Sequence, residues 1–226
     1  MIPFANHVFA THLLDYREQV DNVFDCYDRQ CKSSSSVAAI KRKLNTSIAA
    51  LETLLNGIID RAYKNYPAFN LDYDEFNTIC TGVYWVGVRY DEDRATYIFT
   101  VNPSARITVW NYPEDGTNHN PSLFVEEKEC EQVNLLCGNV LSFKRELSDN
   151  EAVHKQAKDN LSEAIENLRK ALANSETPLP SSSNTHSLYN LKQGAELSFR
   201  VVDYDLIIEP SSIGQNDIVW MRSKDD

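Results

Sequence analysis

Glycine is scarce in this sequence: its seven glycines do not cluster, and neither a P-loop nor a GxGxxG fingerprint is present. Those motifs use closely spaced glycines to bring the backbone against phosphate groups, so their absence argues against a nucleotide cofactor held by a local motif. A GxSxG elbow and the local signatures of cysteine proteases are also missing. We therefore expect no cofactor and no nucleophilic catalysis of these kinds.

The chain also lacks long apolar runs and paired cysteine motifs. No window approaches the roughly 18 uninterrupted apolar residues that a membrane-spanning helix needs. The first twenty residues carry no basic segment before an apolar one, so they do not resemble a signal peptide. The cysteines are scattered and lack CxxC spacing, which is typical of reduced thiols. They are Cys26, Cys31, Cys80, Cys130 and Cys137. We expect a cytoplasmic protein without disulfides.

Basic residues are fewer than acidic residues. Lysine and arginine number 22 against 33 aspartates and glutamates, for a formal net charge of −11. Binding to nucleic acid relies on a lysine- and arginine-rich footprint, so a nucleic acid partner is not expected. A protein partner with a basic surface fits this charge better.

Two apolar seams with helical spacing run through the first third of the chain. They predict two long helices joined by a turn at the serine-rich stretch CKSSSS, so that residues 1–67 form an antiparallel helical hairpin. Its seams can pack on each other and on a sheet, or they can join partner helices or a second copy of the chain. The seam positions are Phe9, Leu13, Tyr16, Val20, Val23 and Tyr27, followed by Val37, Ile40, Leu44, Ile48, Leu51, Leu55, Ile58 and Ala62.

Alternating apolar residues in GVYWVGVRYDEDRATYIFTV predict a β-hairpin over residues 82–101. A turn centred on Glu92 and Asp93 pairs Val88 with Tyr97 and Val86 with Phe99, and a third strand then pairs Phe99 with Ile107. The face that carries these apolar side chains is expected to be a core.

The opposite face of this predicted sheet is mixed in character. It carries Trp85, Gly87 and Arg89 on the first strand, and Arg106 and Trp110 on the third. Tryptophan and arginine are the residues most often found at interaction hot spots, so this face is a candidate binding surface. Cover by a helix, with the arginines at its edge, is the structural alternative.

The second half of the chain mixes strands with one more helix. PSLFVEEKE predicts a strand, and CEQVNLLCGNVLSFKREL suits strands with a turn at Cys137–Asn139. A helix is predicted from Ser148 and Glu151, which have capping-box spacing, with Val153, Ala157, Leu161, Ile165, Leu168 and Leu172 as its apolar stripe. A connector at about residues 174–187 leads to strands in AELSFRVVDYDLIIEP and DIVWMR.

Helices followed by strands around one further helix predict an α+β fold with an antiparallel sheet. The expected organisation is a helical hairpin over residues 1–67 and an α+β domain over residues 68–226, together forming one compact unit.

One stretch resembles a nuclease pattern. In YPEDGTNHNPSLFVEEK, an acidic residue precedes a Glu-x-Lys sequence, as in the PD-(D/E)xK nucleases. The resemblance implies that Asp115 and Glu126 bind Mg²⁺ and that Lys128 positions or activates the attacking water. A solvated, charged strand end also explains the EEKECE run.

Other possible metal ligands are weaker. Asp72 with Asp74, and Asp203 with Asp205, lie in two DYD stretches, and for the second pair a hairpin turn is the favoured interpretation. No cysteine or histidine spacing resembles a zinc site, so no metal site is expected. The histidines are His7, His12, His119, His154 and His186; among them, His119 is of interest because it lies near Asp115.

The preferred functional hypothesis is an acidic, soluble protein-binding module that neutralises or adapts a partner, with the physical profile of immunity proteins, phage anti-defence inhibitors and adaptor proteins. Asp91, Glu92 and Asp93 would steer the approach of a basic surface, and Trp85 or Trp110 would anchor it. One alternative is the Mg²⁺-dependent phosphodiesterase. Another is a small-molecule sensor in which a ring lies beside Gly87, between Trp85 and Trp110.

Overall fold

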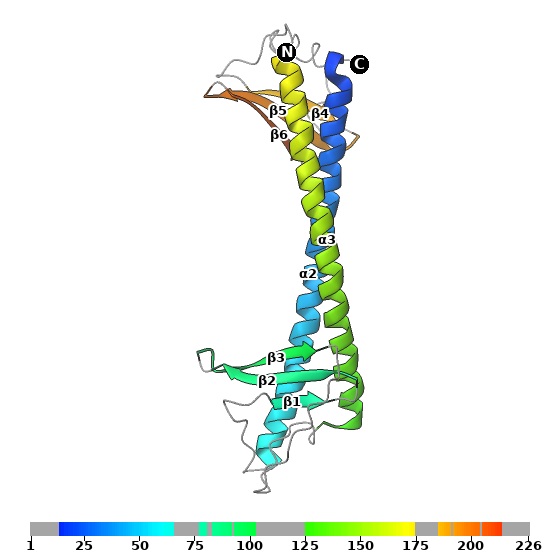
Figure 1. The fold of residues 1–226 in the computed structure, drawn as a ribbon, viewed down its shortest axis with the longest axis vertical. Helices are drawn as coiled ribbons and strands as arrows, with labels where there is room; N and C mark the ends of the chain where they lie inside the picture. Colours follow the sequence, from blue (N-terminus) through cyan, green and yellow to red (C-terminus); the bar gives the residue numbers. More distant parts are fainter. Residues whose placement is uncertain are drawn as a thin grey trace. The chain divides into compact units, whose positions relative to one another are not determined.

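The computed structural model of the chain describes residues 14–65, 77–80, 83–91, 93–102, 125–174, 185–190, 192–203 and 205–213. These residues form the 3-10 helix η1 (Leu14–Tyr16) and the long helices α2 (Arg17–Asn65) and α3 (Glu127–Ala173). They also form two antiparallel three-stranded sheets (Figure 1). The α+β class, the long helices and the antiparallel sheets are confirmed.

The chain divides into two units, and each long helix contributes to both. The first unit consists of residues 1–37 and 150–226, and its sheet has the order β4-β5-β6 (His186–Asn190, Ala195–Val202 and Asp205–Ser212). The second unit consists of residues 38–149, and its sheet has the order β1-β2-β3 (Asn77–Cys80, Trp85–Asp91 and Thr96–Asn102).

Helix α2 is continuous where a serine-rich turn was predicted between two helices. The Ser33, Ser35 and Ser36 hydroxyls donate hydrogen bonds to the carbonyls of Gln30, Cys31 and Lys32, at 2.9, 3.0 and 3.1 Å. Each serine hydroxyl therefore has its hydrogen bond within the helix. It does not draw the backbone into a turn conformation. The predicted break at CKSSSS is wrong. The seam positions on either side of it, from Val20 to Ala62, are buried, except that Tyr27 and Ile48 are half-buried.

Helix α3 begins some twenty residues before the predicted start. The Glu126 carbonyl accepts hydrogen bonds from the backbone amides of Glu129 and Cys130, at 2.9 and 3.0 Å, and the Glu129 carboxylate accepts one from the Glu126 amide at 2.9 Å. A glutamate three residues into the helix thus provides half of a capping box. The strand over PSLFVEEKE cannot include Glu127 onward, and Ser148 is an interior residue, not a cap.

Two further predictions about α3 are wrong. The turn at Cys137–Asn139 is helical, because Val133, Cys137 and Val140 form a buried helical stripe that continues across it. Val153, which was predicted to begin the apolar stripe, is 60% exposed. It does not share the buried position of Leu168 and Leu172.

The β2–β3 hairpin is present, but its register differs from the prediction. Val88 pairs with Phe99 and Val86 with Val101, so each residue meets the one two positions beyond its predicted partner. Because side chains alternate with a period of two, this shift leaves the same residues on each face. The expected core face is confirmed: Val86 and Val88 are buried, and Phe99 packs against the same cluster. The third predicted strand lies outside the described residues.

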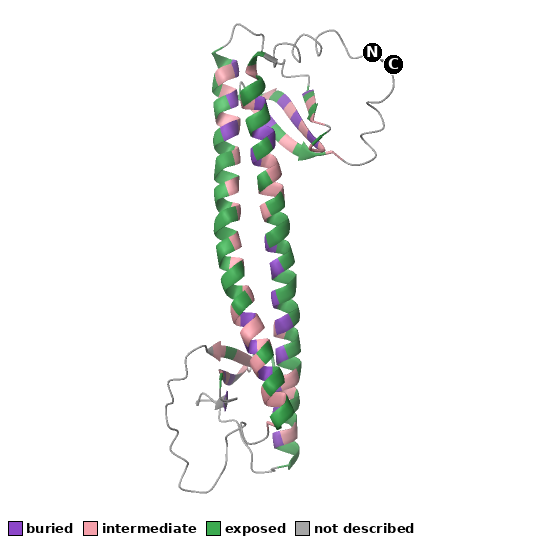
Figure 2. Cartoon of the chain, turned by 90° about the vertical axis from the view of Figure 1, so that its right-hand side faces the viewer, coloured by how far each residue is buried: buried purple, intermediate pink, exposed green. Residues whose placement is uncertain are grey.

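The core of the second unit joins α2, α3 and one face of the β1-β2-β3 sheet. Along α2, the buried residues (purple) follow the side that faces α3 (Figure 2). Leu55 and Ile58 from α2, Ile79 and Val86 from the sheet, and Val133 from α3 are all fully buried. Removal of these side chains from water holds the sheet on the helix pair.

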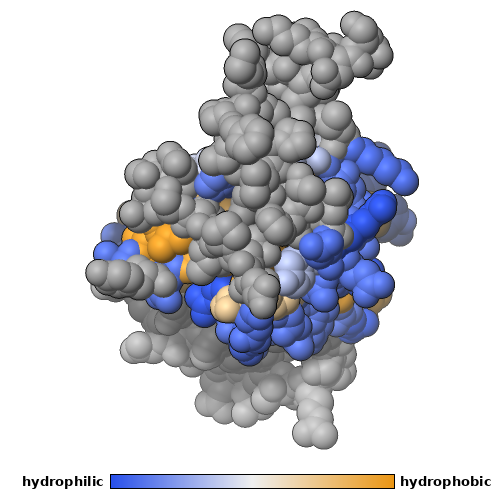
Figure 3. Space-filling model, turned by 90° about the horizontal axis from the view of Figure 1, so that it is seen from above, coloured by the Kyte–Doolittle hydropathy of each residue, from blue (hydrophilic) through white to orange (hydrophobic). Residues whose placement is uncertain are grey.

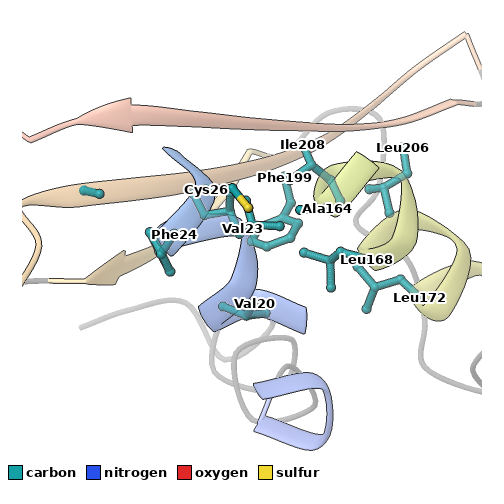
Figure 4. Packing of buried hydrophobic residues seen from close by; sticks show 12 residues of the cluster. Val20, Val23, Phe24, Cys26, Ala164, Leu168, Leu172, Phe199, Leu206 and Ile208 are labelled. Carbon is teal, nitrogen blue, oxygen red and sulfur yellow. The ribbon is translucent and has the colours of Figure 1, made fainter. Parts of the chain in front are cut away.

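The core of the first unit is built around Phe199. Its ring lies between side chains of α2, such as Val23, and side chains of α3, such as Leu168 (Figure 4). Leu206 and Ile208 of β6 complete the cluster. Strand β4 begins at the end of the predicted connector. It was not predicted because apolar and polar residues do not alternate clearly there: its inward positions include His186, which is buried, and Leu188, which is half-buried.

Candidate functional site

The structure describes part of the predicted binding face on the second unit. Trp85 and Arg89 lie in β2, where they pair with Asn102 and Ile98 of β3. Arg106 and Trp110 lie outside the described residues. Two of the four proposed hot-spot residues are therefore placed, by their strand positions, in the expected sheet.

The described residues around these positions are mixed in size and polarity. Thr96 and Thr100 of β3 are exposed, and Ile98 and Gly87 are half-buried. A β-carbon at position 87 would lie 3.8 Å from the Thr100 carbonyl oxygen, which is ordinary contact. Crowding by the neighbouring strand does not require glycine there.

The acidic turn of the hairpin has a structural component. The Asp91 carboxylate accepts hydrogen bonds from the backbone amides of Asp93 and Arg94, at 3.1 and 3.3 Å, and its side chain is only 18% exposed. This carboxylate stabilises the turn, as aspartates at turn starts commonly do. Asp93 is exposed, whereas Glu92 lies outside the described residues.

A tyrosine cluster lies where the hairpin meets the end of α2. We use this name for Tyr63 of α2, Tyr90 of β2 and Tyr97 of β3. The rings of Tyr90 and Tyr97 are 5.2 Å apart in an edge-on arrangement, and the hydroxyl groups of Tyr97 and Tyr63 are hydrogen-bonded. Burial, followed by that hydrogen bond and by nearby charges including Asp60, raises the pKa of Tyr97. The Tyr97 hydroxyl group therefore stays neutral at physiological pH and can both donate and accept a hydrogen bond.

In the sequence, Tyr97 is predicted to face the core, and Tyr63 has no predicted role. Tyr63 comes one residue after Ala62, the last position of the apolar seam. The helical pattern alone therefore places Tyr63 beside the seam and predicts no contact with the sheet. Its contact with β3 depends on where the hairpin crosses α2, which no local pattern encodes.

An ion pair links the end of α2 to the start of α3. Arg61 Nη2 donates to both Glu129 carboxylate oxygens, at 2.6 and 2.5 Å, and the Glu129 side chain is 16% exposed. Burial by itself raises the pKa of Glu129, but hydrogen bonds from Arg61 and from the Glu126 amide outweigh it, so the pKa lies below its ordinary value. The hydrogen bond to Glu129 raises the pKa of Arg61. This pair fixes the two helix ends together.

The residues of the nuclease-like pattern are only partly described. Glu126 is exposed at the start of α3, with one oxygen 3.8 Å from Arg61, and Lys128 is exposed in the first helical turn. The Glu-x-Lys sequence is therefore not on a strand, as the resemblance had implied. Asp115 lies outside the described residues, so its distance from Glu126 stays open.

In the first unit, polar contacts tie the sheet to the helices. The hydroxyl groups of Tyr27 and Ser212 are 3.1 Å apart, and the Gln193 amide donates to Asp25 at 2.8 Å. The part of the described surface that is visible in Figure 3 is mainly hydrophilic, with hydrophobic residues confined to small areas. These contacts help to attach the β4-β5-β6 sheet to α2.

The remaining histidine and aspartate candidates fall into three groups. His154 contacts Ser33 at 3.0 Å, and His186 is buried in β4.

Asp203 occupies the turn before β6 with φ 50, so the hairpin-turn interpretation of the second DYD stretch is confirmed. The candidates outside the described residues are Asp72, Asp74, His7, His12 and His119. Among the described residues, no three His, Cys, Asp or Glu side chains are grouped to hold a metal ion.

Comparison of the chain with known protein families, with curated proteins and with solved structures finds no match. Neither long helix in the described part of the chain has a stretch apolar enough to cross a membrane.

Proposed function

We propose that this chain is a protein-binding module and that the β1-β2-β3 sheet of its second unit carries the binding surface. The observation that carries the proposal is that, among the described residues, the helices cover one side of this sheet. Ile79, Val86 and Val88 are buried against the helices, whereas Thr96 and Thr100, on the other side of β3, are exposed. The second face is therefore proposed to meet a partner.

The end of the hairpin supports the same proposal. Figure 1 shows the β2–β3 hairpin extending past α2, and Asp93 and Arg94 in its turn are exposed. Residues on an exposed turn that is held by a rigid sheet are well placed for recognition. The partner is proposed to have a basic surface, because the chain has a formal net charge of −11. Its role is to neutralise or adapt that partner in the cytoplasm.

The test uses the full chain and two matched variants. Trp85→Ala combined with Arg106→Ala removes one aromatic and one basic residue that the sequence pattern assigns to this face. Tyr189→Ala combined with Arg200→Ala removes the same types from the β4-β5-β6 sheet, where both residues are exposed. Tagged proteins are incubated with lysate, and each retained protein is purified and titrated against the chain.

We expect one protein to be retained in stoichiometric amount by the wild type and by the Tyr189, Arg200 variant. Loss of a hot-spot pair weakens binding by about tenfold or more, so the Trp85, Arg106 variant should not retain it. Equal retention by both folded variants would exclude this face. If no protein is retained by the folded wild type, the binding function itself is wrong.

A further inference from the structure

The tyrosine cluster is only partly closed to solvent. Tyr63 is 39% exposed, and Tyr90 and Tyr97 are half-buried. Burial is nevertheless the largest cause of the raised pKa of Tyr97, so the packed rings already exclude part of the water around its hydroxyl group. A second molecule that contacts Tyr63 would therefore cover an exposed ring beside the packed pair of Tyr90 and Tyr97.

A carboxylate borders this aromatic surface. Asp60 lies one helical turn before Tyr63 on α2, is exposed, and interacts electrostatically with the Tyr97 hydroxyl group. Asp91 follows Tyr90 in β2, but neighbouring strand residues point to opposite faces, and its carboxylate holds the turn amides instead.

Aromatic rings beside carboxylates attract a particular kind of group. A guanidinium or ammonium group is drawn to the face of a tyrosine ring, and a nearby carboxylate adds a charge-assisted hydrogen bond. Arginine suits such a site better than lysine, because its planar group stacks on rings and is more weakly hydrated. The Asp60 carboxylate would repel the phosphates of a nucleic acid.

We propose that the tyrosine cluster is the contact point for an arginine side chain on the partner protein. The arginine stacks on Tyr63 and donates a hydrogen bond to Asp60. This inference rests on the proposed protein-binding function and adds the chemistry of the partner and the position of the contact. It places the contact where the helix-covered side of the hairpin meets the end of α2, on the side of the sheet opposite Thr96 and Thr100.

The direct test is a titration of the full chain with synthetic peptides of equal length that alternate glycine with arginine, lysine or glutamate. Binding is followed by the NMR signals of the tyrosine rings. We expect the arginine peptide to shift the Tyr63 and Tyr97 signals saturably, the lysine peptide to bind more weakly, and the glutamate peptide to leave the signals unchanged. Equal binding of the arginine and lysine peptides, or no shift at Tyr63, would overturn the proposal.

Three variants assign the effect to the cluster. Asp60→Asn should weaken binding of the arginine peptide about threefold, as expected for an exposed ion pair. Tyr63→Ala should weaken it about tenfold. Glu52→Gln is the matched control, since it removes one exposed negative charge from the same helix; an equal loss of affinity in this variant would indicate a general charge effect and overturn the proposal.

The inference and the proposed function fail in different ways. A partner that the wild type retains from lysate, and that the folded Asp60→Asn, Tyr63→Ala double variant retains equally, would overturn the arginine contact and leave the binding function intact. Absence of any retained protein would overturn the binding function.

Discussion

The hydroxyl group of Tyr84 lies so close to Gly138 that a β-carbon at position 138 would stand 3.3 Å from it. Tyr84 precedes β2, and Gly138 lies inside α3, so this contact joins the sheet to the helix. Glycine weakens a helix interior, but here its missing side chain makes room for the tyrosine. The contact gives a packing reason for glycine at this helical position.

Alanine substitutions at two helical glycines should therefore have different effects. Gly57→Ala in α2 is expected to raise the free energy of unfolding by about 1 kcal/mol, because a β-carbon at position 57 meets nothing within 4 Å. Gly138→Ala should gain less, or lose stability, because of the Tyr84 hydroxyl group. Chemical denaturation measures both. Addition of Tyr84→Phe to Gly138→Ala should recover part of the gain, and equal gains for the two glycines would contradict the packing argument.

The Arg61 and Glu129 pair should contribute stability that depends on pH. Because the pKa of Glu129 in the folded chain lies below its ordinary value of 4.5, the contribution is complete above that pH. It is lost as the pH falls through the folded pKa. At about pH 7, Glu129→Gln is expected to lower the free energy of unfolding by about 1.5–3 kcal/mol, the usual contribution of hydrogen bonds to charged groups.

Denaturant unfolding at several pH values tests this prediction. The difference between wild type and Glu129→Gln should shrink as the solution becomes acidic. Glu127→Gln is the control, since Glu127 is exposed in the same helical turn. A loss that stays constant down to about pH 3 would show that packing, and not the charge, carries the effect.

Ala95 stores backbone strain in the β2–β3 turn. Its φ of 49 lies in the left-handed region, which is unfavourable for a residue with a β-carbon. Ala95→Gly should raise the free energy of unfolding by about 0.5–1 kcal/mol. This is the net effect of the relieved strain and of the extra conformational entropy that glycine loses on folding. Ala39→Gly in α2 should instead lower it by about 1 kcal/mol. A loss at both positions would contradict the backbone assignment at Ala95.

The thiol of Cys137 should be unreactive in the folded chain. Cys137 is fully buried, and burial raises its pKa to about 11. The thiolate, which reacts with alkylating reagents, is then about one molecule in a thousand at pH 8. Mass spectrometry after brief iodoacetamide treatment should find Cys137 unmodified and Cys130, which is half-buried on the same helix, modified first. Equal labelling of the two would show that α3 opens locally.

Periodic patterns predicted the faces of helices and strands well. The α2 seam was correct from Val20 to Ala62, and the inner face of the β2–β3 hairpin was correct although its register was not. The wrong predictions fall at residue types that occur both in turns and inside helices. Serine and glycine favour turns in an isolated segment, yet both occur inside the long helices of this chain.

The candidate site was predicted less completely. The sequence identified the sheet and its acidic turn, but not the tyrosine cluster, because Tyr63 and Tyr97 are far apart along the chain. It also assigned Asp91 to partner binding alone, whereas its carboxylate caps the turn amides of Asp93 and Arg94.

The sequence by itself determined the α+β class, the apolar side of α2 and the alternation of the strands, because the helical and strand periods are properties of neighbouring residues. The tertiary structure alone decided that α3 begins at Glu127 and passes through Gly138, and that Tyr63 meets Tyr97. These features depend on contacts between residues distant in the sequence, whose energies exceed the local preference of a serine or a glycine.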